Sequence, residues 1–366
     1  MKNQIHNLEI NNFKSIRHLE LDCKRINVLI GEPNVGKSNI LEAISIFSAP
    51  FMQFNNAVFK DLIRFEKLSN LFYDQDRKNI ISINTDIGSA GLRFHMNSIN
   101  QYDFCLCPSK EALNGAFKIE GSMHSIQQEF DKYIKLNDFS GESIKPFYSP
   151  ISNEKNFDFI RNVNYETPIK RYIFQPLYKH DSHFSLFLSP PFGDNLYTIL
   201  ESNPKLYDEC SHFFTKYGLD LLIDTETNKL DVQKRVGNRV YKIPYALAAD
   251  TLQRIIFHFA AIETNHDSIL IFEEPEAHSF PKYISMFADK VIASTNNQFF
   301  IATHSPYLLT PFIEECDPKD IAIFICTYEN YETKARALTD KEIGNIMENG
   351  IDMFYNIAAF ENDSSK

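Results

Sequence analysis

Residues 26–44, INVLIGEPNVGKSNILEAI, decide the fold of this chain. The run RINVLI (25–30) predicts a strand buried on both faces. The next segment, GEPNVGKS from Gly31 to Ser38, fits the pattern G-x-x-x-x-G-K-[ST]. Residues 37–48 then predict a helix with one apolar face. A strand, a glycine-bounded loop and a helix in this order predict a loop that holds a nucleoside triphosphate.

The residue types of this loop suit phosphate binding. Glycines permit positive φ, so that the backbone N–H groups can point inward at a phosphate. The helix that begins at Lys37 adds its positive N-terminal end. Lys37 supplies a point charge to the β and γ oxygens, and the Ser38 hydroxyl can ligate magnesium. We therefore expect nucleotide contacts from Gly31, Asn34, Val35, Gly36, Lys37, Ser38 and Asn39.

The composition is that of a soluble globular protein with a substantial core. The chain has 366 residues, of which 43% are hydrophobic and 23% charged. It has no apolar run of roughly 18 residues and no secretory signal, and its six cysteines are scattered, so we expect a cytoplasmic protein that has no contact with a membrane. The net charge of −11 argues against a general polyanion binder but leaves room for a local basic groove.

Two glutamates end a second apolar strand, in SILIFEEPEAHSFP (268–281). Glu273 and Glu274 stand at its C-terminal end, where open parallel sheets place their ligands. One acid can hold magnesium through water, and the next can polarise an attacking water. Glu273 lies 236 positions after Lys37, a separation that predicts a substantial insertion between two halves of one site.

A histidine follows a third apolar strand, in FFIATHSP (299–306). His304 could donate to the γ-phosphate or sense its loss. In the last third of the chain, expected strands alternate with expected helices, which predicts a parallel sheet covered by helices. The expected helices are 251–263 and 281–293, and the expected strands are 268–273, 298–303 and 320–326.

The rest of the chain divides into strands, a loop and a helical region. Alternating apolar residues predict strands at 7–13 and 16–22 and an antiparallel meander at 79–86, 90–97 and 102–107. Residues 138–168 are rich in Ser, Asn and Pro and predict a loop or arm. Helices at 194–217 precede short strands at 219–226 and 239–244. We expect a first part of the head at 1–120, an inserted arm and helical lobe at 121–245, and a second part of the head at 246–366.

The three motifs together resemble the ABC-type ATPase heads of the SMC/RecF/OLD group, often described as AAA15 or AAA21 ATPases. The resemblance extends to INNFKSIRHLELDCKRINVLIGEPNVGKSNILEAI, EEPEAHSFP and ATHSP, in about the first 50 and last 120 residues. It implies a P-loop NTPase fold of the α/β class, with a mostly parallel sheet flanked by helices, an antiparallel β subdomain and an inserted helical lobe. It also implies ATP and Mg²⁺ as cofactors, with Glu274 and His304 as catalytic residues.

In heads of this group, two copies sandwich two ATP molecules, and a signature segment on one copy caps the nucleotide of the other. The resemblance places that segment at ALAADTLQRIIFHFAAIE (246–263), with Asp250 and Thr251 as caps of a helix and Arg254 at a position that is often basic. Ala248 and Ala249 replace the expected Ser or Gly, so these positions cannot offer a hydroxyl contact, and the rate of turnover stays open, with Thr251 as a substitute donor. The magnesium-side residues would be Ser38, Glu273, where relatives usually carry Asp, and Gln175.

The resemblance also carries an expectation about function. Compact ATPases of this kind occur as one half of bacterial anti-phage defence pairs, and the 62 residues after His304 are too few for a TOPRIM nuclease domain. We expect an ATP-driven switch that forms homodimers or higher homo-oligomers, senses infection or abnormal DNA, and controls a separate effector such as a nuclease. Two alternatives stay open: a RecF-like repair clamp that binds DNA directly, and a nucleotide-binding scaffold with little turnover.

Overall fold

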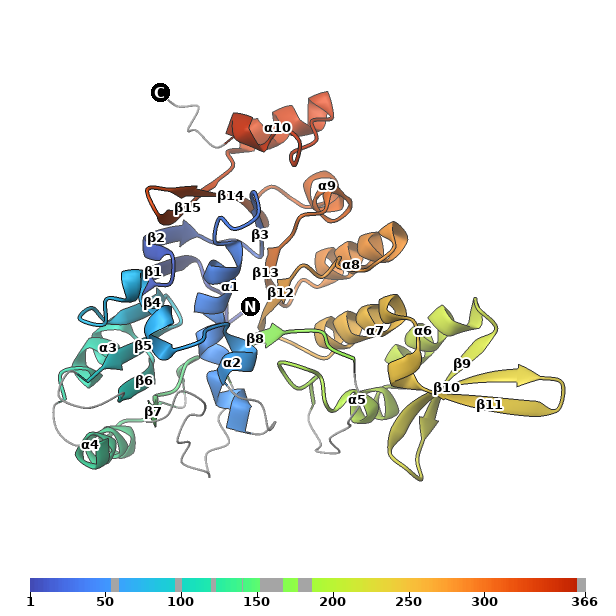
Figure 1. The fold of residues 1–366 in the computed structure, drawn as a ribbon, viewed down its shortest axis with the longest axis horizontal. Helices are drawn as coiled ribbons and strands as arrows, with labels where there is room; N and C mark the ends of the chain where they lie inside the picture. The colour runs from blue at the N-terminus through green and yellow to red at the C-terminus, as the bar shows by residue number, and fades with distance from the viewer. Residues whose placement is uncertain are drawn as a thin grey trace.

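The protein is described by a computed structural model that covers residues 1–53, 59–95, 101–119, 123–139, 141–151, 167–176 and 186–360. Within these ranges the strands form two six-stranded sheets and one three-stranded sheet. Figure 1 shows an antiparallel sheet, helix α1, a mostly parallel sheet and a row of helices on its far face. The α/β class and the mostly parallel sheet expected from the sequence are confirmed.

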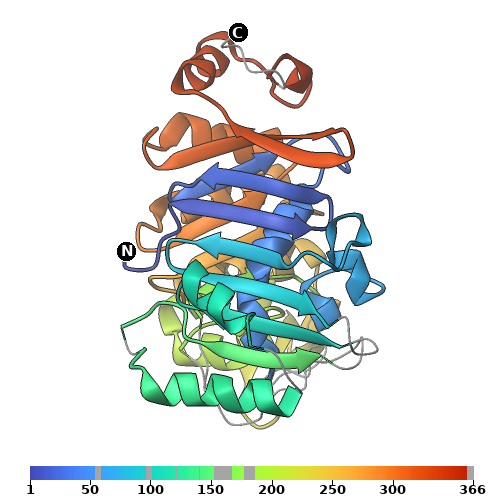
Figure 2. The ribbon, with the colours of Figure 1, turned by 90° about the vertical axis from the view of Figure 1, so that its left-hand side faces the viewer.

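The antiparallel sheet forms one wall of the molecule, and Figure 2 looks onto it. Its strand order is β2-β1-β4-β5-β6-β7. Burial alternates along β2 because only one face of the sheet touches the core. The strands are Asn7–Phe13 (β1), Ile16–Asp22 (β2), Ile81–Thr85 (β4), Gly88–Phe94 (β5), Tyr102–Cys107 (β6) and Phe147–Ile151 (β7). Helices α3 (Lys110–Ala116) and α4 (Met123–Leu136) pack near β6 and β7.

The second six-stranded sheet has the order β15-β14-β3-β13-β12-β8. All neighbours in it run parallel except β14 and β15. β3 and β13 are buried along their whole length because both faces of the sheet are covered. The strands are Ile26–Ile30 (β3), Ile169–Tyr172 (β8), Ile269–Glu273 (β12), Gln298–Ala302 (β13), Ile321–Glu329 (β14) and Glu332–Ala337 (β15).

Helices cover both faces of this sheet. Helix α1 (Lys37–Ser45) lies between the two large sheets, and its apolar side chains share one core with both of them. It ends before the predicted residue 48, and the chain continues as the 3₁₀ helix η1 (Ile46–Gln53), which contains Pro50. On the far face lie α7 (Asp250–Glu263), α8 (Pro281–Ala293) and α9 (Pro306–Glu315). None of the described helices has both the length and the apolar character needed to cross a bilayer.

A smaller lobe extends from the row of helices. It consists of α5 (Leu196–Ser202), α6 (Pro204–Thr215) and a three-stranded antiparallel sheet of β9 (Leu219–Asp224), β10 (Lys229–Val236) and β11 (Arg239–Pro244). Figure 1 shows this sheet pointing away from the rest of the molecule. Its base is anchored because Leu221, Leu230 and Val232 belong to the core that also contains α6 and α7.

The middle of the chain differs from its sequence-based interpretation. Residues 138–168 were expected to form a loop, yet they contain β7, which pairs with β6. β8 also falls within the segment assigned to the lobe, and it pairs with β12 in the parallel sheet. Both strands are only four or five residues long and begin beside polar and proline-rich sequence, so they carry no readable alternation. Residues 152–166 of the expected arm lie outside the described residues.

The helices expected at 194–217 are α5 and α6; Asn203 ends α5 and its side chain caps α6, which starts with Pro204. Several other elements had no sequence-based prediction. Beyond the last motif come α9, β15 and α10 (Asp340–Asn349). Helix α10 begins with a capping box formed by Thr339 and Glu342.

Candidate functional site

One cavity of about 280 Å³ contains the motif residues from three separate parts of the sequence. Because β3, β13 and β12 are parallel neighbours, their C-terminal ends meet at one edge of the sheet. The loop after β3, the acids after β12 and the histidine after β13 therefore converge. The residues that line this candidate cavity are Ser15, Pro33, Asn34, Gly36, Lys37, Ser38, Asn39, Glu273, Glu274, Ala302, His304 and Tyr328.

The loop that forms the floor of the candidate cavity depends on Gly36. Its φ of +97° is unfavourable for a side chain, and a Cβ atom there would lie 2.0 Å from the Thr333 hydroxyl oxygen. Thr333, on β15, donates to the Val35 carbonyl at 3.0 Å and shares a 2.6 Å hydrogen bond with the Ser15 hydroxyl. Ser15 in turn accepts from the Asn39 amide at 2.7 Å. The β1–β2 turn, which carries Ser15, and strand β15 thus brace the loop. Ser15 falls in the NFKS stretch quoted for the resemblance, but no role was predicted for it, and no motif identified Thr333.

Lys37 is held with its ammonium group inside the loop. Its Nζ donates to the carbonyl oxygens of Gly31 at 2.9 Å and of Glu32 at 2.8 Å. Burial lowers the pKa of Lys37, while Glu273 and Glu274 act in the opposite direction. Since an ammonium group has three N–H donors, two carbonyl partners among the described residues leave one N–H for a ligand oxygen.

Glu273 is held by several donors rather than left exposed in the candidate cavity. Arg171 from β8 donates to one carboxylate oxygen of Glu273, and Arg64 donates to the other at 3.0 Å. Ser38 also forms a hydrogen bond with this carboxylate. Burial would raise the pKa of Glu273, but the charge of Arg171, the Ser38 hydrogen bond and Arg64 outweigh it and hold that pKa below its ordinary value. The carboxylate is therefore ionised and oriented in the protein alone.

Glu273 belongs to a larger charge network beneath the candidate cavity. Glu42 on α1 is fully buried, and it pairs with Lys14 and, at 2.8 Å, with Arg64. Arg64 thus bridges Glu42 and Glu273, and Arg171 completes the network with a side chain only 4% exposed. Lys14 and Glu42 fall in the stretch quoted for the resemblance, although no role was predicted for them. The sequence offered no signal for Arg64 and Arg171, because their partners lie far apart along the chain.

Glu274 and His304 lie beside each other in the lining of the candidate cavity. The His304 Nε2 atom lies 3.7 Å from a Glu274 carboxylate oxygen. Glu274 has a φ of +46°, and its N–H donates to the Ala302 carbonyl at 2.9 Å, which ties the acid to the strand that carries the histidine. Burial and the charge of Lys37 lower the pKa of His304 although Glu274 opposes them, so the neutral imidazole is favoured.

Glu276 fixes the backbone that carries His304. One of its carboxylate oxygens accepts from the Thr303 hydroxyl at 2.7 Å and from the His304 N–H at 2.8 Å. Burial raises the pKa of Glu276, and these two hydrogen bonds oppose the rise. Sequence reasoning stopped at the acid pair and missed this third glutamate, although the spacing E-E-P-E was visible.

The signature-like residues lie outside the candidate cavity. The expectation that Asp250 and Thr251 cap α7 is wrong: the N-cap residue is Ala249, without a side-chain cap. The Asp250 carboxylate instead pairs with Arg254 at 2.7 Å, and the Thr251 hydroxyl donates to the His278 carbonyl at 2.8 Å. Local pairing has thus replaced capping, and the action of these residues on a second copy stays a prediction.

Gln175 also lies apart from the candidate cavity. It follows β8, is exposed and is absent from the residues that line the cavity. Its predicted link to magnesium therefore has no geometric counterpart in the protein alone, and it stays a prediction.

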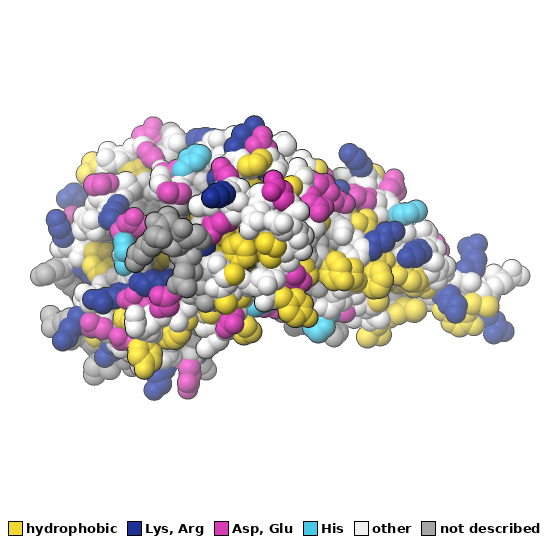
Figure 3. All heavy atoms as spheres, turned by 90° about the horizontal axis from the view of Figure 1, so that it is seen from above, with side chains coloured by type: hydrophobic (Ala, Val, Ile, Leu, Met, Phe, Trp, Pro, Cys, Tyr) yellow, Lys and Arg dark blue, Asp and Glu magenta, His cyan; other side chains and the backbone are white. Residues whose placement is uncertain are grey.

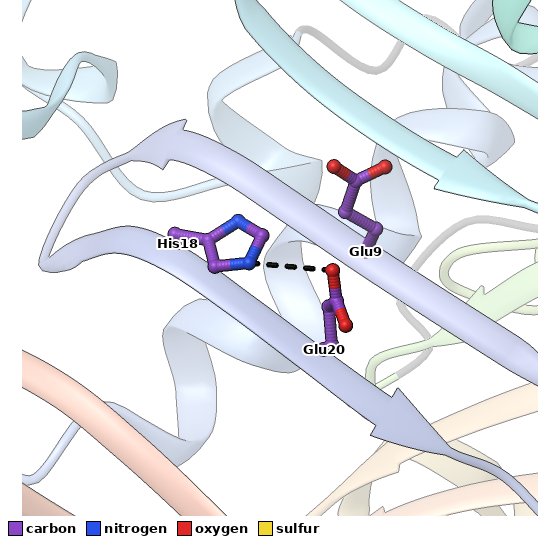
Figure 4. A group of neighbouring side chains, drawn as sticks. All are labelled: Glu9, His18 and Glu20. Atoms are coloured by element: carbon purple, nitrogen blue, oxygen red, sulfur yellow. Dashed lines mark ion pairs between the residues drawn. The ribbon is translucent and has the colours of Figure 1, made fainter.

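A different group of metal-ligand side chains lies on the antiparallel sheet. Figure 4 shows Glu9, His18 and Glu20 on the β1–β2 hairpin, with ligand atoms within 4.8 Å of one another. Protein partners already satisfy them: Glu9 binds Lys110 at 2.6 Å and Asn84 at 2.9 Å, and His18 lies 3.3 Å from Glu20. None of the three lines the candidate cavity, so we do not count them as part of the site.

The donor set of the candidate cavity fits a magnesium triphosphate. A helix N-terminus and a buried lysine offer positive charge and N–H donors for phosphate oxygens. The Ser38 hydroxyl and the Glu273 carboxylate are hard oxygen donors of the type that magnesium prefers, and they already lie within hydrogen-bond contact of each other. A carboxylate and an imidazole are groups that can hydrogen-bond a water molecule, and Glu274 and His304 provide them 3.7 Å apart.

This fold and this cavity define a P-loop ATPase. The chain belongs to the AAA_15 family, described as an AAA ATPase domain, whose family model matches residues 1–235 and 250–309. A curated relative, the "ATP/GTP phosphatase" of Helicobacter pylori (strain ATCC 700392 / 26695), is 20% identical over 342 residues, covering 87% of this chain and 90% of the relative.

Solved structures of SMC heads match this chain. An SMC head bound to the C-terminal winged-helix domain of ScpA matches with a TM-score of 0.50 and 15% identity, covering 93% of this chain and 99% of that one. An SMC head with an extended coiled coil from Pyrococcus furiosus, bound to the C-terminal domain of ScpA, matches with a TM-score of 0.49 and 12% identity over 94% of this chain and 98% of that one. The family and the head-type fold expected from the sequence are confirmed.

Proposed function

We propose that this ATPase hydrolyses ATP with magnesium as an ABC-type head, and that two copies pair when ATP is bound and separate after hydrolysis. The observation that carries the proposal is the convergence of Lys37, Ser38, Glu273, Glu274 and His304 on one cavity, from three parallel strands. Each of these residues has the chemistry that one part of phosphoanhydride hydrolysis requires.

The chain's own groups divide the work. The loop N–H groups and Lys37 bind and orient the terminal phosphates, and Ser38 and Glu273 hold the metal. Magnesium, when bound, supplies positive charge against the phosphate oxygens. The Glu274 carboxylate accepts a hydrogen bond from the attacking water and orients it, and His304 lies close enough to hydrogen-bond the same region through Nε2. Glu276 keeps His304 in place through the backbone.

Pairing of two heads is supported by exposed apolar side chains at the same edge of the sheet. Helices α8 and α9 follow β12 and β13, so they begin at the edge that bears the candidate cavity, and α7 starts beside α8 through the Thr251 bond to His278. Leu247, Phe280 and Tyr307 stand at the starts of these helices and are 69%, 66% and 57% exposed. Pairing of two heads at this edge would bury these three apolar groups, which otherwise remain in contact with water.

The test uses a variant that binds ATP without hydrolysing it. We expect Glu274→Gln to retain ATP, to lose turnover and to form a dimer with ATP and magnesium, measured by light scattering after size exclusion. Lys37→Ala should lose nucleotide binding and stay monomeric, and Phe280→Asp in the Glu274→Gln background should bind ATP without pairing. A Glu274→Gln protein that stays monomeric with ATP excludes the pairing. Equal turnover of the wild type and Lys37→Ala excludes the ATPase site and favours a scaffold.

The proposal also covers a protein partner and a cellular role. In the matched structure an SMC head is bound to a domain of ScpA, and we propose by analogy that this head also takes a separate protein partner. The anti-phage role and the sensing of abnormal DNA stay predictions from the family resemblance. A neighbouring effector gene, and loss of phage protection in the Lys37→Ala variant, would support them, and full protection without ATP binding would contradict them.

A further inference from the structure

The lobe ends in a two-stranded ribbon: β9 pairs with β10 only as far as Lys234, and beyond that position β10 pairs with β11 alone. Residues 234–242 of β10 and β11 are all exposed, whereas Leu230 and Val232 nearer the base are buried. Figure 1 shows this ribbon projecting beyond the helices, and the residues that line the candidate cavity include none of it. A ribbon that extends past the core gains no stability from burial, so its sequence is free to serve a surface contact.

The ribbon is strongly basic although the whole chain carries a net charge of −11. Residues 229–242 hold five basic side chains and one acidic side chain. Lys242 is neutralised by Asp224 at 3.0 Å. Lys234, Arg235 and Arg239 form no ion pair with any described residue, so their charges are available to a partner. Figure 3 shows Lys and Arg side chains beside hydrophobic ones at the narrow, projecting end of the molecule.

The strand register distributes these cations over both faces of the ribbon. Lys234 lies opposite Tyr241 and Val236 lies opposite Arg239, which places all four on one face. Arg235 lies opposite Val240 on the other face. Each face therefore combines unpaired positive charge with an exposed apolar or aromatic group, since Val236, Val240 and Tyr241 are 52%, 47% and 49% exposed. The whole ribbon, rather than one side of it, is suited to contact with an anion.

We propose that the β10–β11 ribbon binds duplex DNA by entering its major groove. A two-stranded ribbon has the width that this groove admits, and phosphates flank the groove on both sides, where cations on both faces can reach them. An acidic protein or membrane surface would meet only one face of the ribbon at a time. The major groove of duplex RNA is too narrow and deep for side chains to read, so the geometry favours DNA over RNA.

The inference goes beyond the proposed ATPase function and does not rest on it. The ribbon and the candidate cavity share no residue, and the ribbon is rooted in α6 and α7 rather than in the loop that binds phosphate. Loss of DNA binding and loss of ATP turnover are therefore separable outcomes. The cations lie at exposed positions, so replacing them leaves the core untouched.

The experiment measures binding of full-length protein to a labelled DNA duplex by fluorescence anisotropy over a range of salt. The test variant is Lys234→Gln/Arg235→Gln/Arg239→Gln. The matched control, Lys78→Gln/Lys132→Gln/Lys205→Gln, removes three exposed charges elsewhere. If the three ribbon cations contact phosphates, the test variant should bind roughly 30-fold more weakly at about 50 mM salt, and its log–log salt slope should fall by about 2.7. The control should bind as the wild type does, and both variants should keep ATP turnover.

Several outcomes would overturn the inference. These are absence of DNA binding by the wild type at low salt, equal binding by the test variant, and an equal loss in the control. Duplex RNA and vesicles of anionic phospholipid serve as competitor arms. If RNA displaces DNA at equal phosphate concentration, the ribbon binds polyanions in general and does not recognise the DNA major groove. Retention on vesicles without DNA binding would assign the ribbon to a membrane surface.

Discussion

Arg171→Met should destabilise the protein through the loss of one buried charge pair. The Arg171 side chain is 4% exposed, and it donates to Glu273 and, at 2.8 Å, to the Leu62 carbonyl. Methionine fills a similar volume but carries neither donor. Glu273 would keep Arg64 and Ser38 as partners, whereas the Leu62 carbonyl would lose the donor that Arg171 provides.

The expected magnitude follows from these contacts. Breaking a fully buried pair costs about 3–5 kcal/mol, but the Glu273 side chain is 21% exposed and remains paired with Arg64. We therefore expect about 3 kcal/mol in total, of which about 1 kcal/mol is the carbonyl hydrogen bond. Glu273→Gln removes the negative charge of the same pair. The loss of stability in the double variant Arg171→Met/Glu273→Gln should therefore be about 1–2 kcal/mol smaller than the sum of the losses in the two single variants.

Urea unfolding followed by far-UV circular dichroism measures these free energies, since the chain contains no tryptophan. Arg25→Met is a matched control: Arg25 is also buried, pairs with Asp320 at 3.3 Å and lies outside the charge network. Arg25→Met should destabilise the protein, but its loss of unfolding free energy should simply add to the loss caused by Glu273→Gln. Additivity of Arg171→Met and Glu273→Gln to within about 0.5 kcal/mol would refute the direct pair. Because the folded-state pKa of Glu273 is lowered, the coupling should be complete above pH 4.5 and should weaken as the pH falls through that lowered pKa.

Two further predictions concern the loop and the C-terminal helix. Gly36→Ala should lower ATP affinity at least about 10-fold, measured by calorimetry, because its Cβ would overlap Thr333 at a φ of +97°. Gly237→Ala, at a φ of +57° with no atom within 4 Å, is the control and should leave ATP affinity unchanged. Hydrogen bonds from Arg336 and Thr339 outweigh burial and lower the pKa of Glu342 to about 2, so hydrogen-exchange protection of α10 should be full above pH 4.5 and fall as the pH approaches about 2. Glu342→Gln should remove that pH dependence, and an unchanged profile would contradict it.

The sequence predicted those parts of the fold that have a local signature. The strand, loop and helix around Lys37 and the strands before Glu273 and His304 are each readable from apolar runs and turn residues. Parallel strands put such residues at one edge of a sheet, so a shared site could be expected. The strand order that makes β3, β13 and β12 neighbours could not be predicted, because it depends on packing between distant segments.

The parts that escaped prediction depend on single long-range contacts. Thr333 braces the loop at Val35 from almost the other end of the chain, and nothing near Thr333 marks it as special. Arg64 and Arg171 are isolated charges whose common partner lies more than 100 residues later. Periodicity reports which face of an element is buried, but it does not report which acid a given arginine meets. Family resemblance did not supply these contacts either.

The charge network gives a physical reason for the length of the Glu273 side chain. Its carboxylate contacts Ser38 on one side and two arginines on the other, and the extra methylene extends the reach of the side chain. An unpaired carboxylate beside a triphosphate would repel it, because like charges at short distance in a partly buried site interact strongly. We infer that Arg64 and Arg171 neutralise Glu273 before nucleotide and metal arrive. On this reasoning, shortening the side chain in Glu273→Asp should weaken the arginine contacts, and ATP affinity measured without magnesium should fall.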